Sequence, residues 1–201
     1  ARRKISDFIG VSAQRLIFTS GATESNNLAL AHFPGRIIIS AIEHDSVRLV
    51  RPDAHSIPVS QDGVVDLEFL EELLSIPYEG STLVSVMVAN NETGVIQPLN
   101  DIIALAKKYK AFVHSDVVQG MGRLDFPWHE LDMMSISSHK LGGPAGVGCL
   151  VIHPACVLQP LLKGGGQERS YRPGTENFIG IVGMAEALIT ADVQRWVSVK
   201  K

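Results

Sequence analysis

The sequence predicts a three-layer α/β/α fold, in which helices cover both faces of a mostly parallel central sheet. The first observation is that apolar, strand-like segments alternate with segments whose apolar residues recur at helical spacing. The second is that several strand-like segments are apolar throughout, such as the isoleucine run at 36–40, which is typical of parallel strands buried on both sides. With 201 residues, 45% of them hydrophobic, the chain is long enough for one globular domain.

Strands are expected where branched apolar residues run together between polar ones. The segment at 55–60 is the weakest of these, because Pro58 has no N–H to donate to a neighbouring strand. In chain order, the expected strands are RLIFTS (15–20), RIIIS (36–40), HSIPVS (55–60), STLVSVMVAN (81–90), AFVHSD (111–116), MMSISS (133–138) and GVGCLVI (146–152).

Helices are expected between these strands and at the end of the chain. The helix that follows the first strand has Ser20 or Thr23 as a candidate N-cap and Glu24 in its first turn. The third helix is expected to be capped near Asn100, and 161–177 is the one long loop. The expected helices are GATESNNLALAHF (21–33), VDLEFLEELLS (65–75), LNDIIALAKKYK (99–110) and NFIGIVGMAEALITADVQRW (177–196).

Charge and hydropathy argue against several kinds of partner. The net charge of −3 gives no reason to expect nucleic acid or an anionic membrane. The apolar runs are far shorter than the roughly 18 to 20 residues that a membrane span needs, and the first residues lack the apolar core of a secretory signal. Cys149 and Cys156 make no disulfide framework, which favours a cytoplasmic protein. The histidines lack the spacing of metal ligands, so no metal site is predicted.

Polar residues follow five of the expected strands. The carboxyl ends of parallel strands meet at one edge of a sheet, and ligands bind in the crevice beyond that edge. We therefore expect these polar residues to line one site. They are Gly21, Ala22 and Thr23 after the first strand, Glu43 and His44 after the second, Asn90 to Gly94, then Asp116 and Gln119, and finally Ser137 to Lys140.

These residue types suit one particular ligand. Free backbone N–H groups at Ala22 and Thr23, with the hydroxyls of Thr23 and Ser137, would bind a phosphate. Asp116 could hold a protonated ring nitrogen, and Lys140 could form an imine with an aldehyde. A phosphate, a pyridinium ring and an aldehyde together describe pyridoxal 5'-phosphate. A lysine must lose its proton to attack an aldehyde, so we also expect Lys140 to be partly buried.

Six ordered motifs, spread over nearly the whole chain, resemble a known family. They are TSGATESNN, the Glu43-His44 pair, NNETG, HSDVVQ, SSHK and GGGQER followed by RPGTEN. In order and spacing they resemble the class V aminotransferase family of fold-type I pyridoxal-phosphate enzymes, most closely the cysteine desulfurases of the nitrogen-fixation and iron-sulfur-cluster type.

The resemblance implies a role for each site residue. Lys140 would hold the cofactor aldehyde and move protons, and His44 would stack on the ring and assist acid–base steps. Asp116 would pair with the ring nitrogen and keep it protonated. The remaining implied contacts are Asn91 and Gln119 with the ring hydroxyl, Ala22, Thr23, Ser137 and His139 with the phosphate, and Thr175 with the phosphate of the neighbouring subunit in a homodimer.

The resemblance also implies a reaction, in which L-cysteine yields L-alanine and its sulfur passes as a persulfide to an acceptor or iron-sulfur scaffold protein. In such enzymes the sulfur-accepting cysteine and a substrate-binding arginine lie well C-terminal of the lysine, and neither Cys149 nor Cys156 is expected in that role. We therefore expect 1–201 to be the cofactor-binding large domain, inactive alone, with an N-terminal segment and the C-terminal small domain absent.

Two alternatives stay open. A selenocysteine lyase or another class V aminotransferase would share these motifs, because only sequence beyond Lys201 separates them from a desulfurase. A truncated, non-catalytic paralogue is the other alternative, although the intact Lys140, His44 and Asp116 favour an enzyme. Nucleotide enzymes fit poorly, because GATESNN lacks P-loop spacing and GGPAGVG leads into a strand instead of a helix.

Overall fold

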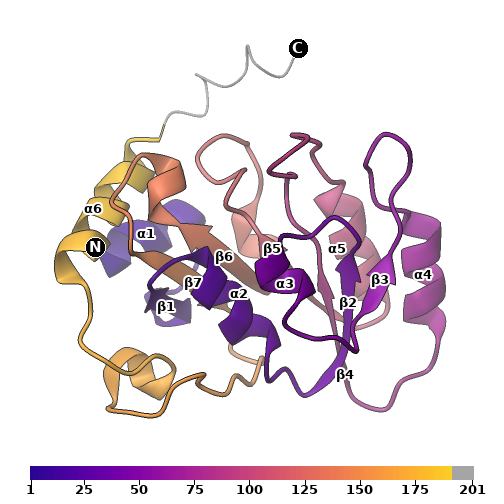
Figure 1. Cartoon of the computed structure of the whole chain (residues 1–201), viewed down its shortest axis with the longest axis horizontal. Helices are drawn as coiled ribbons and strands as arrows, with labels where there is room; N and C mark the ends of the chain where they lie inside the picture. The colour runs from indigo at the N-terminus through magenta and orange to yellow at the C-terminus, as the bar shows by residue number, and fades with distance from the viewer. Residues whose placement is uncertain (192–201) are drawn as a thin grey trace.

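Seven strands form one sheet in the computed structural model, which describes residues 1–191 (Figure 1). Their order is β1-β7-β6-β5-β4-β2-β3. The pairs from β6 to β3 are parallel, whereas β7 is antiparallel to both β6 and β1, so the sheet is mostly parallel as predicted. The strands are β1 (Leu16–Thr19), β2 (Gly35–Ser40), β3 (His55–Ile57), β4 (Ser81–Ser85), β5 (Phe112–Asp116), β6 (Met133–Ser137) and β7 (Gly148–Ile152).

Helices cover both faces of this sheet, which confirms the three-layer prediction. Four helices contribute to the larger hydrophobic core on one face, and two pack with a smaller core on the other. Those of the larger core are α1 (Arg2–Ile9), α4 (Leu67–Ser75), α5 (Leu99–Lys108) and α6 (Phe178–Ile189), and those of the smaller core are α2 (Ala22–Leu30) and α3 (Asp45–Arg48).

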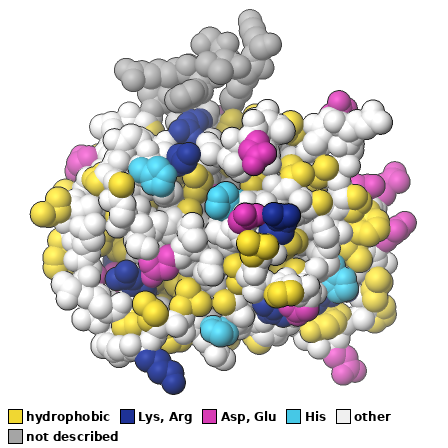
Figure 2. Space-filling model, viewed as in Figure 1, with side chains coloured by type: hydrophobic (Ala, Val, Ile, Leu, Met, Phe, Trp, Pro, Cys, Tyr) yellow, Lys and Arg dark blue, Asp and Glu magenta, His cyan; other side chains and the backbone are white. Residues whose placement is uncertain are grey.

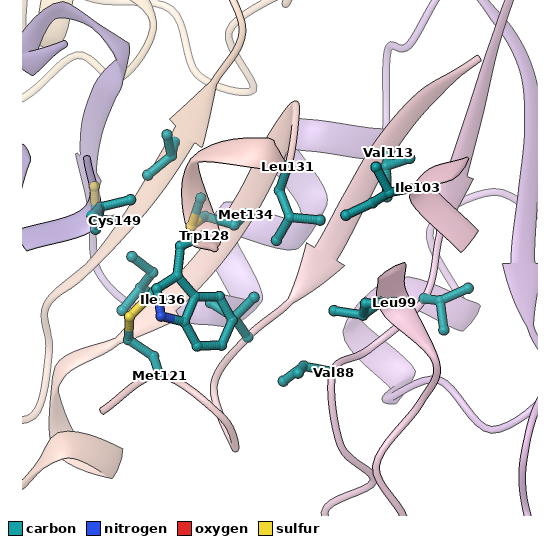
Figure 3. Close-up of a cluster of buried hydrophobic side chains, with 14 of the residues drawn as sticks. Val88, Leu99, Ile103, Val113, Met121, Trp128, Leu131, Met134, Ile136 and Cys149 are labelled. Carbon is teal, nitrogen blue, oxygen red and sulfur yellow. The ribbon is translucent and has the colours of Figure 1, made fainter. Parts of the chain in front are cut away.

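Successive apolar residues of a strand point to opposite faces of the sheet, which explains why helices must cover both faces. In β2, Ile38 lies in the larger core, while its neighbours Ile37 and Ile39 lie in the smaller one. Figure 3 shows part of the larger core, where Trp128 and Met134 lie among side chains from β5, β7 and α5. Burying an apolar side chain of this size contributes roughly 1.5–3 kcal/mol, so both layers of helices stabilise the sheet.

The helix starts differ from the sequence predictions in two places. The N-cap of α2 is Gly21, so the capping expected from Ser20 or Thr23 is wrong. Instead, the Glu24 carboxylate reaches back and accepts a hydrogen bond from the Ser20 N–H at 2.7 Å. Helix α5 begins after Pro98 and has no side-chain cap, so the cap expected near Asn100 is also wrong.

The last described helix is shorter than the sequence predicts. Asn177 caps α6 by accepting a hydrogen bond from the Gly180 N–H at 3.0 Å. The helix ends at Ile189, where the Thr190 hydroxyl bonds to the carbonyls of Glu186 and Ala187. A hydroxyl that competes for helix carbonyls in this way favours a helix end. The rest of the expected helix, at 192–196, lies outside the described residues.

Charged side chains of both signs are interspersed over the face drawn in Figure 2. Apolar side chains are scattered between them across this view. No helix within residues 1–191 is long and apolar enough to cross a membrane.

Candidate cofactor-binding site

A cavity of about 440 Å³ lies beyond the carboxyl ends of the parallel strands. Its walls come from the segments that follow β1, β2, β4, β5 and β6. These are the five segments in which the sequence analysis expects polar residues to converge. Nine of the ten predicted site residues line the cavity, namely Ala22, Thr23, His44, Asn91, Asp116, Gln119, Ser137, His139 and Lys140.

Gly148 explains how two of these walls meet. It pairs with Thr19 of β1 on one side and with Ser137 of β6 on the other. A Cβ atom on Gly148 would lie only 2.6 Å from the Ile136 carbonyl oxygen and 2.7 Å from the Cα atom of Gly21. Only glycine permits this close approach of three backbones, which brings the N-terminus of α2 beside the end of β6.

The α2 end of the cavity is rich in hydrogen-bond donors. The backbone N–H groups of the first turn of α2 have no partner within the helix, and the exposed Thr23 hydroxyl lies beside them. Ser137 is buried, and its Oγ atom lies 3.0 Å from Nδ1 of the exposed His139. Helix N-terminal N–H groups with neighbouring hydroxyls form a good site for an anion.

Asp116 ends β5 and lies at the wall of the cavity with 9% of its surface exposed. Its Oδ2 atom accepts a hydrogen bond from Asn26 Nδ2 at 2.8 Å, and Oδ1 accepts one from the Val118 N–H at 3.1 Å. Burial raises the pKa of Asp116, and these hydrogen bonds and the nearby His44 oppose that rise. A cation bound in the cavity would lower this pKa, because it stabilises the charged carboxylate.

His44 is the N-cap of α3 and presents an exposed ring to the cavity. Its Nδ1 atom accepts a hydrogen bond from the Ser46 N–H at 3.1 Å and lies 2.8 Å from the Ser46 Oγ atom. The ring is therefore oriented from the Nδ1 side, and Nε2 is the nitrogen left for a ligand.

Lys140 lies in the short helical turn η3 (Ser138–Leu141) that directly follows β6. Its side chain lines the cavity but is exposed, so the expected partial burial is wrong. Arg123 fixes the backbone of this turn by donating a hydrogen bond to the Lys140 carbonyl at 2.5 Å and another to the Gln119 carbonyl at 3.1 Å.

The chain resembles known proteins in sequence over most of its length. The sequence pattern of the family described as aminotransferase class-V matches residues 1–196. The chain belongs to the aminotransferase class-V family. The cysteine desulfurase IscS of Dictyoglomus turgidum is 39% identical over 94% of this chain, and the mitochondrial cysteine desulfurase of Eremothecium gossypii is 40% identical over 93%.

Solved structures in this family share the fold. A NifS-like protein from Rickettsia africae superposes on 98% of this chain with a TM-score of 0.89 and 39% sequence identity. This chain covers 57% of that protein, 51% of the Dictyoglomus turgidum desulfurase and 41% of the Eremothecium gossypii one. The chain thus spans about half the length of the relatives that it matches.

Two predicted residues of this class-V chain, Asn91 and Thr175, lie in exposed segments with different surroundings. Asn91 is exposed at the cavity, in a turn that is held by the neighbouring Asn90, whose Oδ1 atom accepts hydrogen bonds from the N–H groups of Glu92 and Thr93. Thr175 is exposed and lies apart from the other nine, on a second cavity of about 90 Å³. Its predicted ligand belongs to a neighbouring subunit, and that contact stays a prediction.

Sequence reasoning missed the polar residues that support the site of this class-V chain. Asn26 and Ser46 are buried and bond to Asp116 and His44. Glu43 was expected to line the site with His44, but it is buried and does not line the cavity, so that expectation is wrong. Asn26 gave no separate signal, because it lies within the polar run from Thr23 to Asn27 at the start of α2. Arg123 gave no signal either, since its role depends on contacts with Gln119 and with the Lys140 carbonyl.

The cysteines of this class-V chain lie away from the cavity. Cys149 is fully buried in β7, and burial raises the pKa of its thiol to about 12. Burial also raises the pKa of Cys156 to about 12. Within residues 1–191, no cluster of three or more His, Cys, Asp or Glu side chains could hold a metal ion. Neither cysteine suits the role of a persulfide carrier, because the thiolate is the reactive form.

Proposed function

We propose that this chain is the pyridoxal-phosphate-binding part of a cysteine desulfurase. The enzyme would convert L-cysteine to L-alanine and pass the sulfur atom to an enzyme cysteine as a persulfide. The observation that carries the proposal is the single cavity shared by Lys140, His44, Asp116 and the donors at the start of α2. The relatives named cysteine desulfurase support the same choice of substrate.

The donor set of the cavity fits this cofactor. The N–H groups of Ala22 and Thr23, with the hydroxyls of Thr23 and Ser137 and the ring of His139, would hold its phosphate. The buried carboxylate of Asp116 would hold a protonated ring nitrogen, and the charge pair would favour both ionised forms. Asn91 and Gln119 lie on the same cavity and would bind the ring hydroxyl.

When bound, the cofactor supplies a ring that accepts electrons from bonds broken at the substrate α-carbon. Asp116 would keep that ring protonated and so raise its capacity to accept electrons. Lys140 Nζ is the amine that would hold the aldehyde, and it would also accept or return a proton. His44 would lie against the ring and offer Nε2 for proton transfer.

The persulfide step requires a further cysteine. A thiol of the enzyme takes the sulfur atom of L-cysteine and becomes a persulfide, while the substrate carbon gains a proton and leaves as L-alanine. Cys149 and Cys156 are buried, so we propose that this thiol lies in the half of the relatives' length that the chain does not span. Residues 1–201 would then bind the cofactor without releasing alanine.

We also propose a cytoplasmic homodimer that hands sulfur to an acceptor or iron-sulfur scaffold protein. Thr175 is exposed, and the nearby Phe178 and Ile179 are 66% and 87% exposed. Exposed apolar side chains of this size favour contact with another protein surface. The two free cysteines support a reducing compartment, which the cytoplasm provides.

Reconstitution with pyridoxal 5'-phosphate tests the proposal. The purified chain should turn yellow, because the cofactor absorbs visible light when an amine of the protein holds its aldehyde. Lys140→Ala should abolish the colour, and Lys163→Ala, on an exposed loop away from the cavity, should keep it. A colourless wild-type chain, or a yellow Lys140→Ala chain, would refute the proposal.

A further inference from the structure

A chain of hydrogen bonds links His44, which we assign to the face of the cofactor ring, to Asp116, which we assign to the ring nitrogen. His44 Nδ1 lies 2.8 Å from Ser46 Oγ, and Asn26 Nδ2 lies 2.8 Å from that same oxygen. Asn26 Nδ2 lies 2.8 Å from Asp116 Oδ2 as well. Asn26 and Ser46 are buried, with 0% and 8% of their surfaces exposed, so bulk water has little access to these bonds.

The donors in this chain can be assigned from simple chemistry. An ionised Asp116 carboxylate only accepts hydrogen bonds, so the Asn26 amide must turn its NH₂ group toward it. The second N–H of that group then donates to Ser46 Oγ. Since Ser46 Oγ already accepts from Asn26, its own proton is free to donate to His44 Nδ1.

The backbone strengthens this assignment. The Ser46 N–H also donates to His44 Nδ1, at 3.1 Å, because His44 caps α3. Nδ1 thus faces two donors and has no acceptor for a proton of its own. A neutral His44 ring must therefore carry its proton on Nε2, the nitrogen left for the cavity.

We propose that Asn26 and Ser46 are positioning residues that transmit the ionised state of Asp116 to His44 and hold its ring in the Nε2–H tautomer. In this arrangement His44 presents a proton donor to the cofactor face, and the same network fixes the rotation of the ring. The catalytic meaning of this tautomer rests on the proposed function, but the hydrogen-bond network itself does not.

Nitrogen-15 NMR of the histidine rings tests the inference on the cofactor-free chain. Spectra at alkaline pH, where histidine rings are neutral, distinguish the two tautomers, and His44→Gln identifies the His44 signals. Wild-type His44 should be in the Nε2–H form. Ser46→Ala removes one bond to Nδ1, so the share of the Nδ1–H form should rise about fivefold, the effect of one ordinary hydrogen bond.

Asn26→Ala is the decisive variant, because Asn26 does not touch His44. It should move the Nδ1 signal in the same direction as Ser46→Ala, and the double variant should move it no further than Ser46→Ala alone. Ser46→Thr keeps the hydroxyl and should restore the wild-type signal. Asn27→Ala is a matched control, since Asn27 bonds to the Ser46 carbonyl instead of its hydroxyl and should leave His44 unchanged.

An Nδ1–H form in the wild type, or a His44 signal that Asn26→Ala leaves unmoved, would overturn the inference. Circular dichroism of each variant separates these outcomes from unfolding, and Ser46→Thr provides a second test if Ser46→Ala unfolds. Adding pyridoxal 5'-phosphate to the same samples tests the proposed function independently. A chain that keeps the Nε2–H signal but stays colourless would refute the desulfurase proposal alone.

Discussion

Glu43 Oε1 accepts a hydrogen bond from the Met87 N–H at 2.7 Å, and this bond ties the segment after β2 to the segment after β4. The same oxygen accepts a bond from the Ser40 hydroxyl at 2.7 Å, while Oε2 has no partner within the described chain. Glu43 is buried with 5% of its surface exposed. A buried carboxyl with one unbonded oxygen is more stable when it is protonated.

We predict that Glu43 makes the protein less stable as the pH rises. Burial raises its pKa from 4.5 to about 8. Between these values the folded chain keeps a proton that the unfolded chain has lost, so the contribution of Glu43 to the unfolding free energy falls by about 1.4 kcal/mol per pH unit. Urea titrations from about pH 6.5 to about 8, above the pH range in which histidines of the unfolded chain take up protons, should show this slope in the wild type.

Glu43→Gln should remove that slope, because glutamine keeps the acceptor oxygen and carries no charge at any of these pH values. The unfolding free energy of the variant, relative to that of the wild type, should therefore increase as the pH rises from 5 to about 8. Glu79→Gln, at an exposed carboxyl, is the control and should leave the slope as it is. Equal slopes in the wild type and in Glu43→Gln would show that Glu43 ionises normally in the folded chain.

His114 should make stability depend on pH with the opposite sign. It is fully buried between Ser85 Oγ at 2.8 Å and Ser135 Oγ at 3.0 Å, and burial lowers its pKa from 6.5 to about 3. Below pH 6.5 His114 binds a proton in the unfolded chain but not in the folded chain, so stability falls as the pH decreases toward 3. His114→Gln should reduce this acid sensitivity by about 1.4 kcal/mol per pH unit, as measured by urea titration. His129→Gln, on the surface, should not.

Local patterns were enough to predict the sheet and four of its covering helices, α2, α4, α5 and α6. Strands such as β2 and β7 are buried on both faces, so several consecutive residues in each are apolar, and such a run is visible in the sequence. The antiparallel direction of β7 could not be predicted from its own residues, because a buried strand looks alike in either direction. It depends on the short connection from η3 and on the pairing of Gly148 with two strands.

The candidate site was predictable for a different reason. Strand ends are recognisable in the sequence, and the rule for parallel sheets brings their polar residues together without any knowledge of side-chain contacts. The supporting residues Asn26, Ser46 and Arg123 were missed because their roles depend on contacts between distant segments, such as the 90-residue separation of Asn26 and Asp116. The exposure of Lys140 was also unpredictable, since it depends on which segments cover the cavity.

Asp116→Asn should weaken cofactor binding without unfolding the chain. Asparagine nearly matches the shape of the carboxylate, and burial of a neutral amide at this position costs less than burial of a charge. The lost attraction to a protonated ring nitrogen should raise the Kd for pyridoxal 5'-phosphate about tenfold or more, because charge-assisted hydrogen bonds are roughly twice as strong as neutral ones. Titration followed by visible absorbance measures this Kd. An unchanged Kd would place the ring nitrogen away from Asp116.

Gly148→Ala should damage both the fold and the site. The new Cβ would contact the backbone at Ile136 and Gly21, at 2.6 and 2.7 Å, so β7 must move away from β1 or β6. Overpacking of this kind costs about 1–3 kcal/mol, and the same movement would separate the start of α2 from Ser137. The unfolding temperature should therefore fall and the Kd for pyridoxal 5'-phosphate should rise in the same variant.

Gly21→Ala is the control for stability, because nothing lies within 4 Å of its added Cβ and its φ of 161° is ordinary extended backbone. A Gly148→Ala chain as stable as Gly21→Ala would show that the strands can separate there without cost.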